Sequence, residues 1–275
     1  MKKSRKISSQ NKRFNKILED IRSIKIQGAE NVARAGIKAF LIEPSKGSAK
    51  RILKTRPTEP LMQNAIKALI KSKNPKKDSI KFLKELKKSH ETIAKKGSTL
   101  IKKDMNIFTH CHSSTVIDIL KYAKRKQKKK FIVYTTEAEP ILQGRMTAED
   151  LSKAKIKVII SPDLAAERAL KNCDLLLFGA DAFTKKEVAN KIGTNTLVNL
   201  AKLHNIPRYA CGVSKKFTKK IKIKLRNPKE VWTIKNKNIK IENPPFDKTP
   251  IKSLTGIISE FGILTPKKFV KKANQ

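Results

Sequence analysis

Short apolar runs that alternate with helical stretches constrain the fold of this chain after residue 100. The runs are rich in β-branched and aromatic residues and read "MNIFTH", "FIVYTT", "KVIIS", "LLLFGAD" and "IPRYACGV". The stretches between them, such as "STVIDILKYAKRK" and "TNTLVNLAKLHN", have helical periodicity. This alternation predicts an α/β fold with a mostly parallel sheet and helices on both faces. We therefore predict a Rossmann-like domain over residues 101–275.

The first hundred residues have a different pattern. Apolar residues of the first stretch recur at steps of three and four, as an amphipathic helix requires: Phe14, Ile17, Leu18, Ile21 and Ile24. Further helical patterns cover "NVARAGIKAFLIE", "TEPLMQNAIKALIKS" and "DSIKFLKELKKSHETIAKKGSTLI", and "EPSKGSAK" is predicted to be a loop. Residues 1–100 are therefore expected to form a helical N-terminal domain.

The chain carries a large positive charge. Its 64 lysine and arginine residues exceed its 23 acidic residues, which gives a formal net charge of +41. Such a charge predicts non-specific, salt-dependent binding to RNA and other polyanions. Only 5% of the residues are aromatic, which disfavours a stacking platform for single strands. Because the lysines are spread along the whole chain, a basic surface is favoured over a dedicated nucleic-acid site.

No targeting or membrane signal stands out in the sequence. No apolar run approaches the roughly 20 residues that a bilayer-spanning helix needs, and the basic start "MKKSRKISSQNKRF" lacks the apolar core of a secretory signal. We therefore expect a cytoplasmic protein that does not bind membranes. Cys111, Cys173 and Cys211 are far apart and form no CxxC pair, which disfavours disulfides and cysteine zinc sites.

Four polar segments follow directly after predicted strands. They read "THCHSST", "TTEAEP", "GAD" and "GVSKKF". In open parallel sheets, ligands bind at the carboxyl ends of the strands. Because all four segments are expected at that edge, the sequence predicts one ligand site there.

Cys111 lies in the first of these segments, between His110 and His112. A cysteine at a strand end is often only a small buried apolar residue. This one precedes "HSST", whose residues would open a helix, and a helix N-terminus lowers a thiol pKa and attracts phosphate. The two histidines would point to the opposite face of the strand, so a shared metal is disfavoured. We predict a thiolate base or nucleophile beside an anion site.

Asp181 follows the apolar strand of "LLLFGADAF". Poor solvation there would raise the pKa of its carboxyl group and suit a proton donor, although a turn or helix-cap aspartate is the alternative. Asn190 and Lys191 of "NKIGTN" would add an amide and a cation at the same edge. Lys216 of "VSKKF" follows the next strand and suits a phosphate.

These segments occur in the order found in a known superfamily. Together with "IKIQGAENVARAG", "TRPTEPLMQNA", "TEAEPILQGRMTAEDL" and "NPPFDKTP", they make the chain resemble archaeal-type members of that superfamily. It comprises the α/β/δ subunits of translation initiation factor 2B, ribose-1,5-bisphosphate isomerase and methylthioribose-1-phosphate isomerase. The resemblance covers roughly the whole chain past the first dozen residues.

The resemblance implies a ligand that is a phosphorylated sugar or a nucleotide. In the isomerases of this family, an aldose and a ketose interconvert, and Cys111 would take the proton that Asp181 returns or relays. Implied ligand contacts are Gln27, Gly28, Ala29, Arg56, Ser113, Ser114, Thr115, Gln143, Asn190, Lys191 and Lys216. No metal or resident cofactor is implied, and a nucleotide is a candidate activator. A homodimer formed through the C-terminal domains, or a hexamer of three such dimers, is also implied.

Three positions depart from the isomerase pattern. Gln27 and Glu139 stand where the family carries arginines, and Glu30 stands where the bisphosphate branch carries glycine. Losing guanidinium groups should weaken phosphate binding. The changes resemble the non-catalytic initiation-factor branch, which typically lacks the cysteine that this chain retains.

Two functions therefore stay open. The favoured one is an isomerase acting on a phosphorylated pentose. The alternative is an archaeal regulatory protein of the initiation-factor-2B type that binds its ligand without turnover and contacts a translation factor. A plain RNA-binding module has only the charge in its favour.

Overall fold

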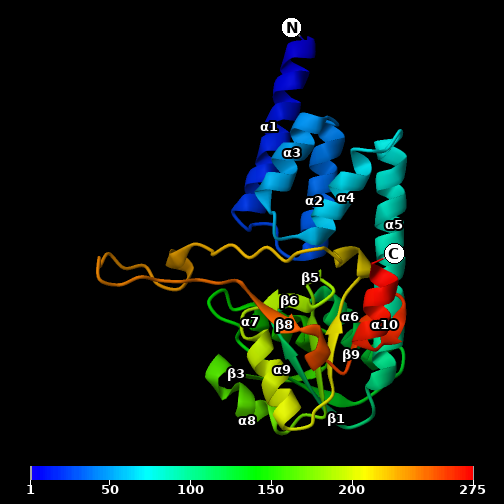
Figure 1. Ribbon diagram of the computed structural model, residues 1–275, viewed down its shortest axis with the longest axis vertical. Helices are drawn as coiled ribbons and strands as arrows, with labels where there is room; N and C mark the ends of the chain where they lie inside the picture. The colour runs from blue at the N-terminus through cyan, green and yellow to red at the C-terminus, as the bar shows by residue number, and fades with distance from the viewer. Residues whose placement is uncertain (1, 275) are drawn as a thin grey trace. The chain divides into compact units, whose positions relative to one another are not determined.

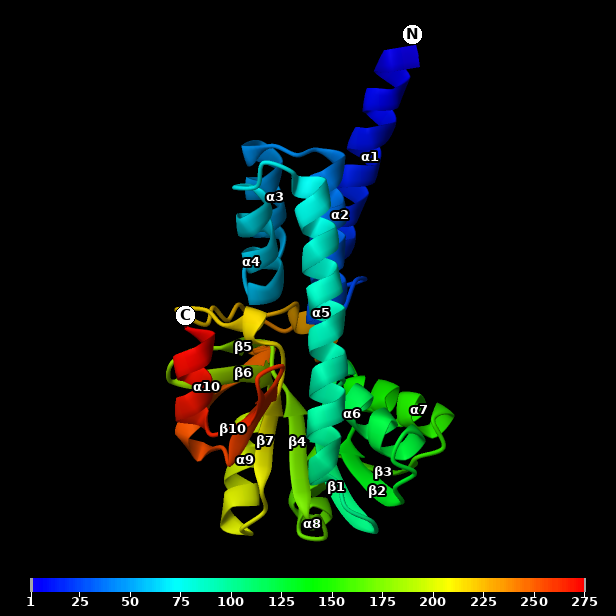
Figure 2. The same ribbon diagram turned by 90° about the vertical axis from the view of Figure 1, so that its right-hand side faces the viewer.

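The computed structural model describes residues 2–274 and is drawn in Figures 1 and 2. The chain packs as two compact units, Met1–Lys88 and Ser89–Gln275. The change from one unit to the other falls inside helix α5 (Pro75–Gly97). The domain boundary near residue 100 stays a prediction.

The N-terminal unit is helical. It contains α1 (Lys2–Arg22), α2 (Ala29–Ile42), α3 (Lys46–Thr55), α4 (Pro60–Leu69) and the first part of α5. The stripe predicted on the first helix buries Phe14, Leu18 and Ile21 completely or nearly so. The loop predicted over "EPSKGSAK" is wrong, because α3 begins inside it. Ser45 starts that helix with a capping box, in which its side chain accepts from the Ser48 amide at 3.0 Å.

The C-terminal unit is built on a seven-stranded sheet. In spatial order its strands are β10 (Gly262–Leu264), β9 (Gly256–Ser259), β7 (Arg208–Cys211), β4 (Leu175–Gly179), β1 (Met105–His110), β2 (Phe131–Thr136) and β3 (Lys157–Ser161). All neighbours are parallel except β10, which runs antiparallel to β9. The predicted α/β fold with a mostly parallel sheet is confirmed.

The helices that connect the strands are α6 (Ser114–Arg125), α7 (Gln143–Lys153), α8 (Ala166–Leu170) and α9 (Thr194–Leu203), and α10 (Pro266–Ala273) ends the unit. Strand order proceeds outward from β1 to β3 and then returns to β4 on the other side of β1. Because parallel crossovers are right-handed, this reversal assigns α6 and α7 to one face and α8 and α9 to the other. In agreement, α6 packs against α7, and α8 packs against α9. The point where the strand order reverses therefore lies between β1 and β4.

A second, three-stranded antiparallel sheet lies beside the carboxyl end of β4. Its order is β5 (Ala182–Phe183), β6 (Glu187–Lys191) and β8 (Phe246–Pro250). The short strand β5 follows β4 after two residues, Ala180 and Asp181, and the Asp181 amide donates to the Ala189 carbonyl at 2.8 Å. This small sheet fixes where the chain after β4 can go.

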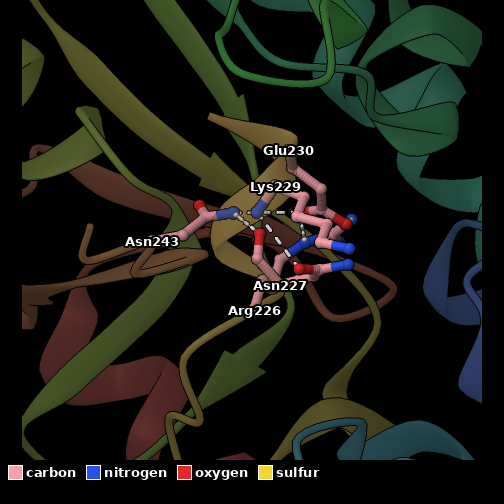
Figure 3. Close-up of polar contacts among 5 residues, drawn as sticks. All are labelled: Arg226, Asn227, Lys229, Glu230 and Asn243. Atoms are coloured by element: carbon pink, nitrogen blue, oxygen red, sulfur yellow. Dashed lines mark hydrogen bonds and ion pairs between the residues drawn. The ribbon is translucent and has the colours of Figure 1, made fainter. Parts of the chain in front are cut away.

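The long segment between η3 (Ser214–Lys216) and β8 has little regular structure apart from η4 (Pro228–Glu230), and Figure 1 draws part of it as an extended orange excursion. Polar contacts tie its two limbs together, as Figure 3 shows. The Arg226 guanidinium donates to both Glu230 carboxylate oxygens at 2.7 Å. The Asn243 amide donates to Glu230 at 2.9 Å and to the Asn227 carbonyl at 3.0 Å. The contacts therefore hold the returning limb in place just before β8 begins.

The core of the C-terminal unit is packed between the sheet and its helices. Its largest fully buried side chains are those of Phe108, Phe178, Phe183 and Phe269. Burial of such side chains supplies the main stabilising free energy of a domain of this type. Within residues 2–274, every helix is too short or too polar to cross a bilayer.

Truncating a core residue of β4 tests this packing. Leu176 is fully buried in the core, so Leu176→Ala should lower the free energy of unfolding by about 2–5 kcal/mol. Leu203 at the end of α9 is 70% exposed, so Leu203→Ala should change it by less than about 0.5 kcal/mol. Urea denaturation followed by circular dichroism measures both variants. Equal effects of the two substitutions would contradict the packing described.

Candidate active site

Cys111 stands at the carboxyl end of β1, next to the central strand β4. The register between the two strands pairs His110 with Phe178, so the chain leaves both strands at the same level of the sheet. Cys111 adopts a φ of 64°, in the left-handed region that costs a non-glycine residue energy. Two residues later, Ser113 caps α6 by accepting from the Val116 amide at 3.4 Å. The strained residue therefore marks the turn from strand to helix.

Helix α7 is fixed against this turn through two side chains. The Cys111 thiol donates to Oε1 of Gln143, the first residue of α7, at 3.1 Å. One turn further along, the Thr147 hydroxyl donates to the Cys111 carbonyl at 2.7 Å. Gln143 and Cys111, both predicted as site residues, are thus in direct contact.

The loop that leads into α7 is held by Asp163, which follows β3. Its carboxylate accepts from the Ala138 amide at 2.9 Å and from the Glu139 amide at 2.8 Å. Burial acts to raise the pKa of Asp163, but hydrogen bonds from Thr136 and these two amides hold it below the usual range. Sequence reasoning missed this residue. Its position directly after the predicted strand "KVIIS" was the available signal.

Gly179, the last residue of β4, lets two other segments pack closely against its backbone. A Cβ at this position would lie 2.5 Å from Oγ of Ser113 and 3.7 Å from Oδ1 of Asn190. The missing side chain therefore allows the first turn of α6 and strand β6 to meet over the end of β4. Asn190 is itself buried and donates to the Thr194 hydroxyl at 3.2 Å.

Lys191 is a buried cation whose charge acts on the Cys111 thiol. Its side chain is only 5% exposed, and burial lowers the pKa of its ammonium group. The Cys111, Asp163 and Glu230 side chains act in the opposite direction, while Arg226 lowers the pKa further. Lys191 and Cys111 therefore act on each other electrostatically.

Cys111 is a neutral thiol in this structure. Burial raises its pKa to about 12, the Lys191 cation opposes that rise, and the Asp181 carboxylate adds to it. The low thiol pKa predicted from the helix N-terminus is wrong for the free protein. Burial of the thiol, which a single sequence does not reveal, outweighs the attraction of the N-terminus of α6 and the Lys191 cation.

Lys216 reaches the same edge from η3. Its ammonium group donates to the Ala180 carbonyl at 2.6 Å, immediately before Asp181, and the residue is only 9% exposed. Asp181 therefore directly follows a carbonyl that accepts a hydrogen bond from Lys216, and it lies two residues after β4, the neighbour of β1.

The segment that enters β8 organises the loop after Lys191. The Ile192 amide donates to the Pro245 carbonyl at 3.0 Å, and the Asp247 carboxylate accepts from the Gly193 and Asn195 amides at 2.8 and 3.0 Å. Gly193 has a φ of 94°, which favours glycine. Asp247, within the family motif "NPPFDKTP", therefore supplies the negative charge at the N-terminus of α9.

His110 and His112 serve the scaffold. His110 Nε2 lies 2.9 Å from the Ile192 carbonyl, and burial lowers the pKa of its ring. Burial also lowers the pKa of His112, whose Nδ1 lies 3.1 Å from the Thr147 hydroxyl. Among residues 2–274, no three His, Cys, Asp or Glu side chains are grouped to hold a metal ion.

The remaining predicted contacts lie in two places. Ser114 and Thr115 form the first turn of α6, next to Ser113. Gln27, Gly28, Ala29 and Arg56 belong to the N-terminal unit, where Gly28 precedes α2 with a φ of 82° and Arg56 donates to the Ile26 carbonyl at 3.2 Å. The roles of all these residues toward a ligand stay predictions.

The protonation state of Cys111 can be measured directly. With a pKa of about 12, the thiolate fraction should rise about tenfold per pH unit between pH 7 and 9.5, and so should the rate of alkylation by iodoacetamide. Peptide mass spectrometry separates Cys111 from Cys173 and Cys211. N-acetylcysteine, with an ordinary pKa near 8.5–9.5, should begin to level off over this range. A plateau for Cys111 near pH 7 would contradict the buried neutral thiol.

The chain has relatives among named proteins. Residues 25–266 match the initiation factor 2 subunit family. A ribose 1,5-bisphosphate isomerase from Methanocaldococcus jannaschii is 33% identical over 278 residues, which cover 90% of each chain. A methylthioribose-1-phosphate isomerase from Thermoanaerobacter sp. is 32% identical over 265 residues, covering 83% of this chain and 76% of that protein. The crystal structure of the translation initiation factor eIF-2B from Pyrococcus horikoshii OT3 superposes with a TM-score of 0.85 at 28% identity, covering 94% of this chain and 98% of that one.

Proposed function

The chain belongs to the initiation factor 2 subunit family, and we propose that it is an aldose–ketose isomerase of the ribose-1,5-bisphosphate isomerase type. Relatives named as sugar-phosphate isomerases support isomerase chemistry in general. The observation that supports the proposal most is that Cys111 directly follows β1, next to β4, and that the charges of both Asp181 and Lys191 act on its thiol. A thiol, a carboxyl group and a cation are the groups that moving a proton between two carbons requires.

In the proposed reaction on ribose 1,5-bisphosphate, Asp181 and Cys111 each transfer one proton in both directions. Asp181 in its acid form gives a proton to the ring oxygen as the C1–O4 bond breaks, and the Cys111 thiolate removes the proton from C2. The result is an enol phosphate between C1 and C2. Asp181 then takes the proton from the C2 hydroxyl, and Cys111 gives its proton to C1. The product is ribulose 1,5-bisphosphate, and both residues return to their starting forms.

The electrostatics of the free site indicate how the reactive form arises. The Asp181 carboxylate raises the pKa of Cys111, whereas Lys191 lowers it. Moving one proton from the thiol to Asp181 removes the repulsion and leaves a thiolate facing the Lys191 cation. The pair is therefore proposed to share a single proton, and the reactive arrangement holds it on the carboxyl group.

Phosphate binding is proposed for the cations and donors around this pair. Lys191 and Lys216 are buried cations, and Ser113 opens a helix whose N-terminus favours an anion. Of the two departures from the family arginines, Glu139 is exposed, and its backbone amide donates to Asp163. Gln27 leaves its phosphate position without the family's cation, so we expect weaker substrate binding rather than loss of the chemistry.

A second function is favoured by a separate observation. The chain superposes closely on an eIF-2B structure, and Gln27 and Glu139 match the non-catalytic branch of the family. In that case the same site would bind a phosphorylated sugar or a nucleotide without turnover, and a translation factor would be the partner.

A direct assay separates the two functions. Purified protein incubated with ribose 1,5-bisphosphate should form ribulose 1,5-bisphosphate, followed by ¹³C NMR. Cys111→Ser and Asp181→Asn should each lower kcat by about 10²–10⁴-fold, because each removes one proton-transfer group. Lys215→Gln, beside Lys216 but not proposed as a contact, is the control and should retain activity. Ligand binding by wild type without any product would support the regulatory function instead.

A further inference from the structure

Three polar side chains form a cluster in the irregular segment before β8. The Arg226 guanidinium donates to both oxygens of the Glu230 carboxylate at 2.7 Å, and the Asn243 amide donates to one of them at 2.9 Å. The Arg226 and Glu230 side chains are only 15% and 23% exposed, and Asn243 is buried. We call these three residues the Glu230 cluster (Figure 3). Its carboxylate is ionised at neutral pH, because hydrogen bonds from Arg226 and Asn243 hold the pKa of Glu230 below its usual range.

The cluster is tied to the strand that carries Lys191. Two residues after Asn243, the Pro245 carbonyl accepts from the Ile192 amide at 3.0 Å. The next residue, Phe246, pairs with Lys191 in the register between β8 and β6. The backbone that leaves the cluster is therefore hydrogen-bonded directly to the backbone around Lys191.

Two carboxylates favour a charged Lys191 in the free protein. Cys111 is then a neutral thiol, so the negative charges that act on the lysine are those of Asp163 and Glu230. Asp163 also holds two amides of the loop before α7. Glu230 and Lys191 act on each other in both directions, since the Lys191 charge also lowers the pKa of Glu230.

Two further ionisable groups belong to the elements around Lys191. Burial lowers the pKa of His110, and the Lys191 charge acts in the same direction, so the imidazole is neutral at pH 7. The Asp247 carboxylate on β8 accepts from the Gly193 and Asn195 amides. The first group therefore carries no charge at neutral pH, and the second serves the start of α9.

We infer that Glu230 is a positioning residue for Lys191. Arg226 and Asn243 hold its carboxylate just before β8, where its negative charge keeps the buried lysine an ammonium ion until an anionic group of the ligand arrives. The part played by the ligand rests on the proposed function, whereas the charge relation exists in the free protein. The role of Glu230 can therefore be measured without turnover.

The rate at which acetic anhydride acetylates Lys191 measures its charge, because only the neutral amine reacts. Below the midpoint of the pH profile between pH 6 and 10, Glu230→Gln in the full-length protein should speed acetylation about two- to tenfold, since removing the carboxylate favours the neutral amine. Arg226→Met should slow it by a similar factor, since it removes a cation and leaves the carboxylate. Peptide mass spectrometry follows Lys191 beside the exposed Lys103, which serves as the internal reference.

Two other variants separate charge from packing. Glu230→Asp keeps the carboxylate and should stay within about twofold of wild type. Glu242→Gln removes an exposed carboxylate that pairs with Lys240 on the same segment, and it should leave Lys191 unchanged. Faster acetylation in both Glu230→Gln and Arg226→Met is the result of a merely structural role and would overturn the inference. Unchanged rates in both, or equal rates in Glu230→Asp and Glu230→Gln, would also overturn it.

Inorganic phosphate tests the proposed ligand separately. Phosphate should protect Lys191 of the wild-type protein from acetylation, because an anion on the ammonium group disfavours the neutral amine. Opposite shifts in Glu230→Gln and Arg226→Met without any protection by phosphate would support the role of Glu230 and contradict only the proposed phosphate contact.

Discussion

The site depends on the meeting of two strand ends, β1 and β4, where the strand order of the sheet reverses. Parallel neighbours must leave the sheet at the same edge, so the residues that follow these two strands lie at one edge of the sheet. Cys111 and Asp181 are those residues, and the carboxylate already affects the pKa of the thiol. Gly179 at the end of β4 is needed as well, because a side chain there would collide with Ser113. The arrangement therefore follows from sheet topology plus one glycine.

Burial then shifts the pKa values of ionisable residues at this edge. A thiol, an amide and two lysines are each less than 10% exposed at this edge, in Cys111, Asn190, Lys191 and Lys216. Burial disfavours charge, so it raises the pKa of Cys111 and lowers that of Lys191. A phosphorylated ligand would supply negative charge next to cations that already lack water, which makes their attraction strong. The same burial keeps the thiol unreactive in the free protein.

Much of the fold could be predicted from the sequence, and less of the electrostatics. Each apolar run after residue 100 contains a strand: β4 is buried along its whole length, whereas β3 is largely exposed at the sheet edge. The polar segments after these strands reach one edge as parallel pairing requires. The small antiparallel sheet was not predicted, because β5 has only two residues and β8 lies after a long irregular segment. Asp163 was missed since its role is to hold backbone amides from a distant loop. The raised pKa of Cys111 was missed because helix position can be read from local sequence, whereas burial depends on how separate segments pack.

The most direct measurement of the central claim is the alkylation rate of Cys111 at pH 8 in two charge-removing variants. If Asp181 and Lys191 face the thiol across one crevice, Asp181→Asn lowers the pKa of Cys111 and speeds alkylation, and Lys191→Met raises the pKa and slows it. Rates equal to wild type in both variants would contradict the account, since the three side chains would then lie in separate environments.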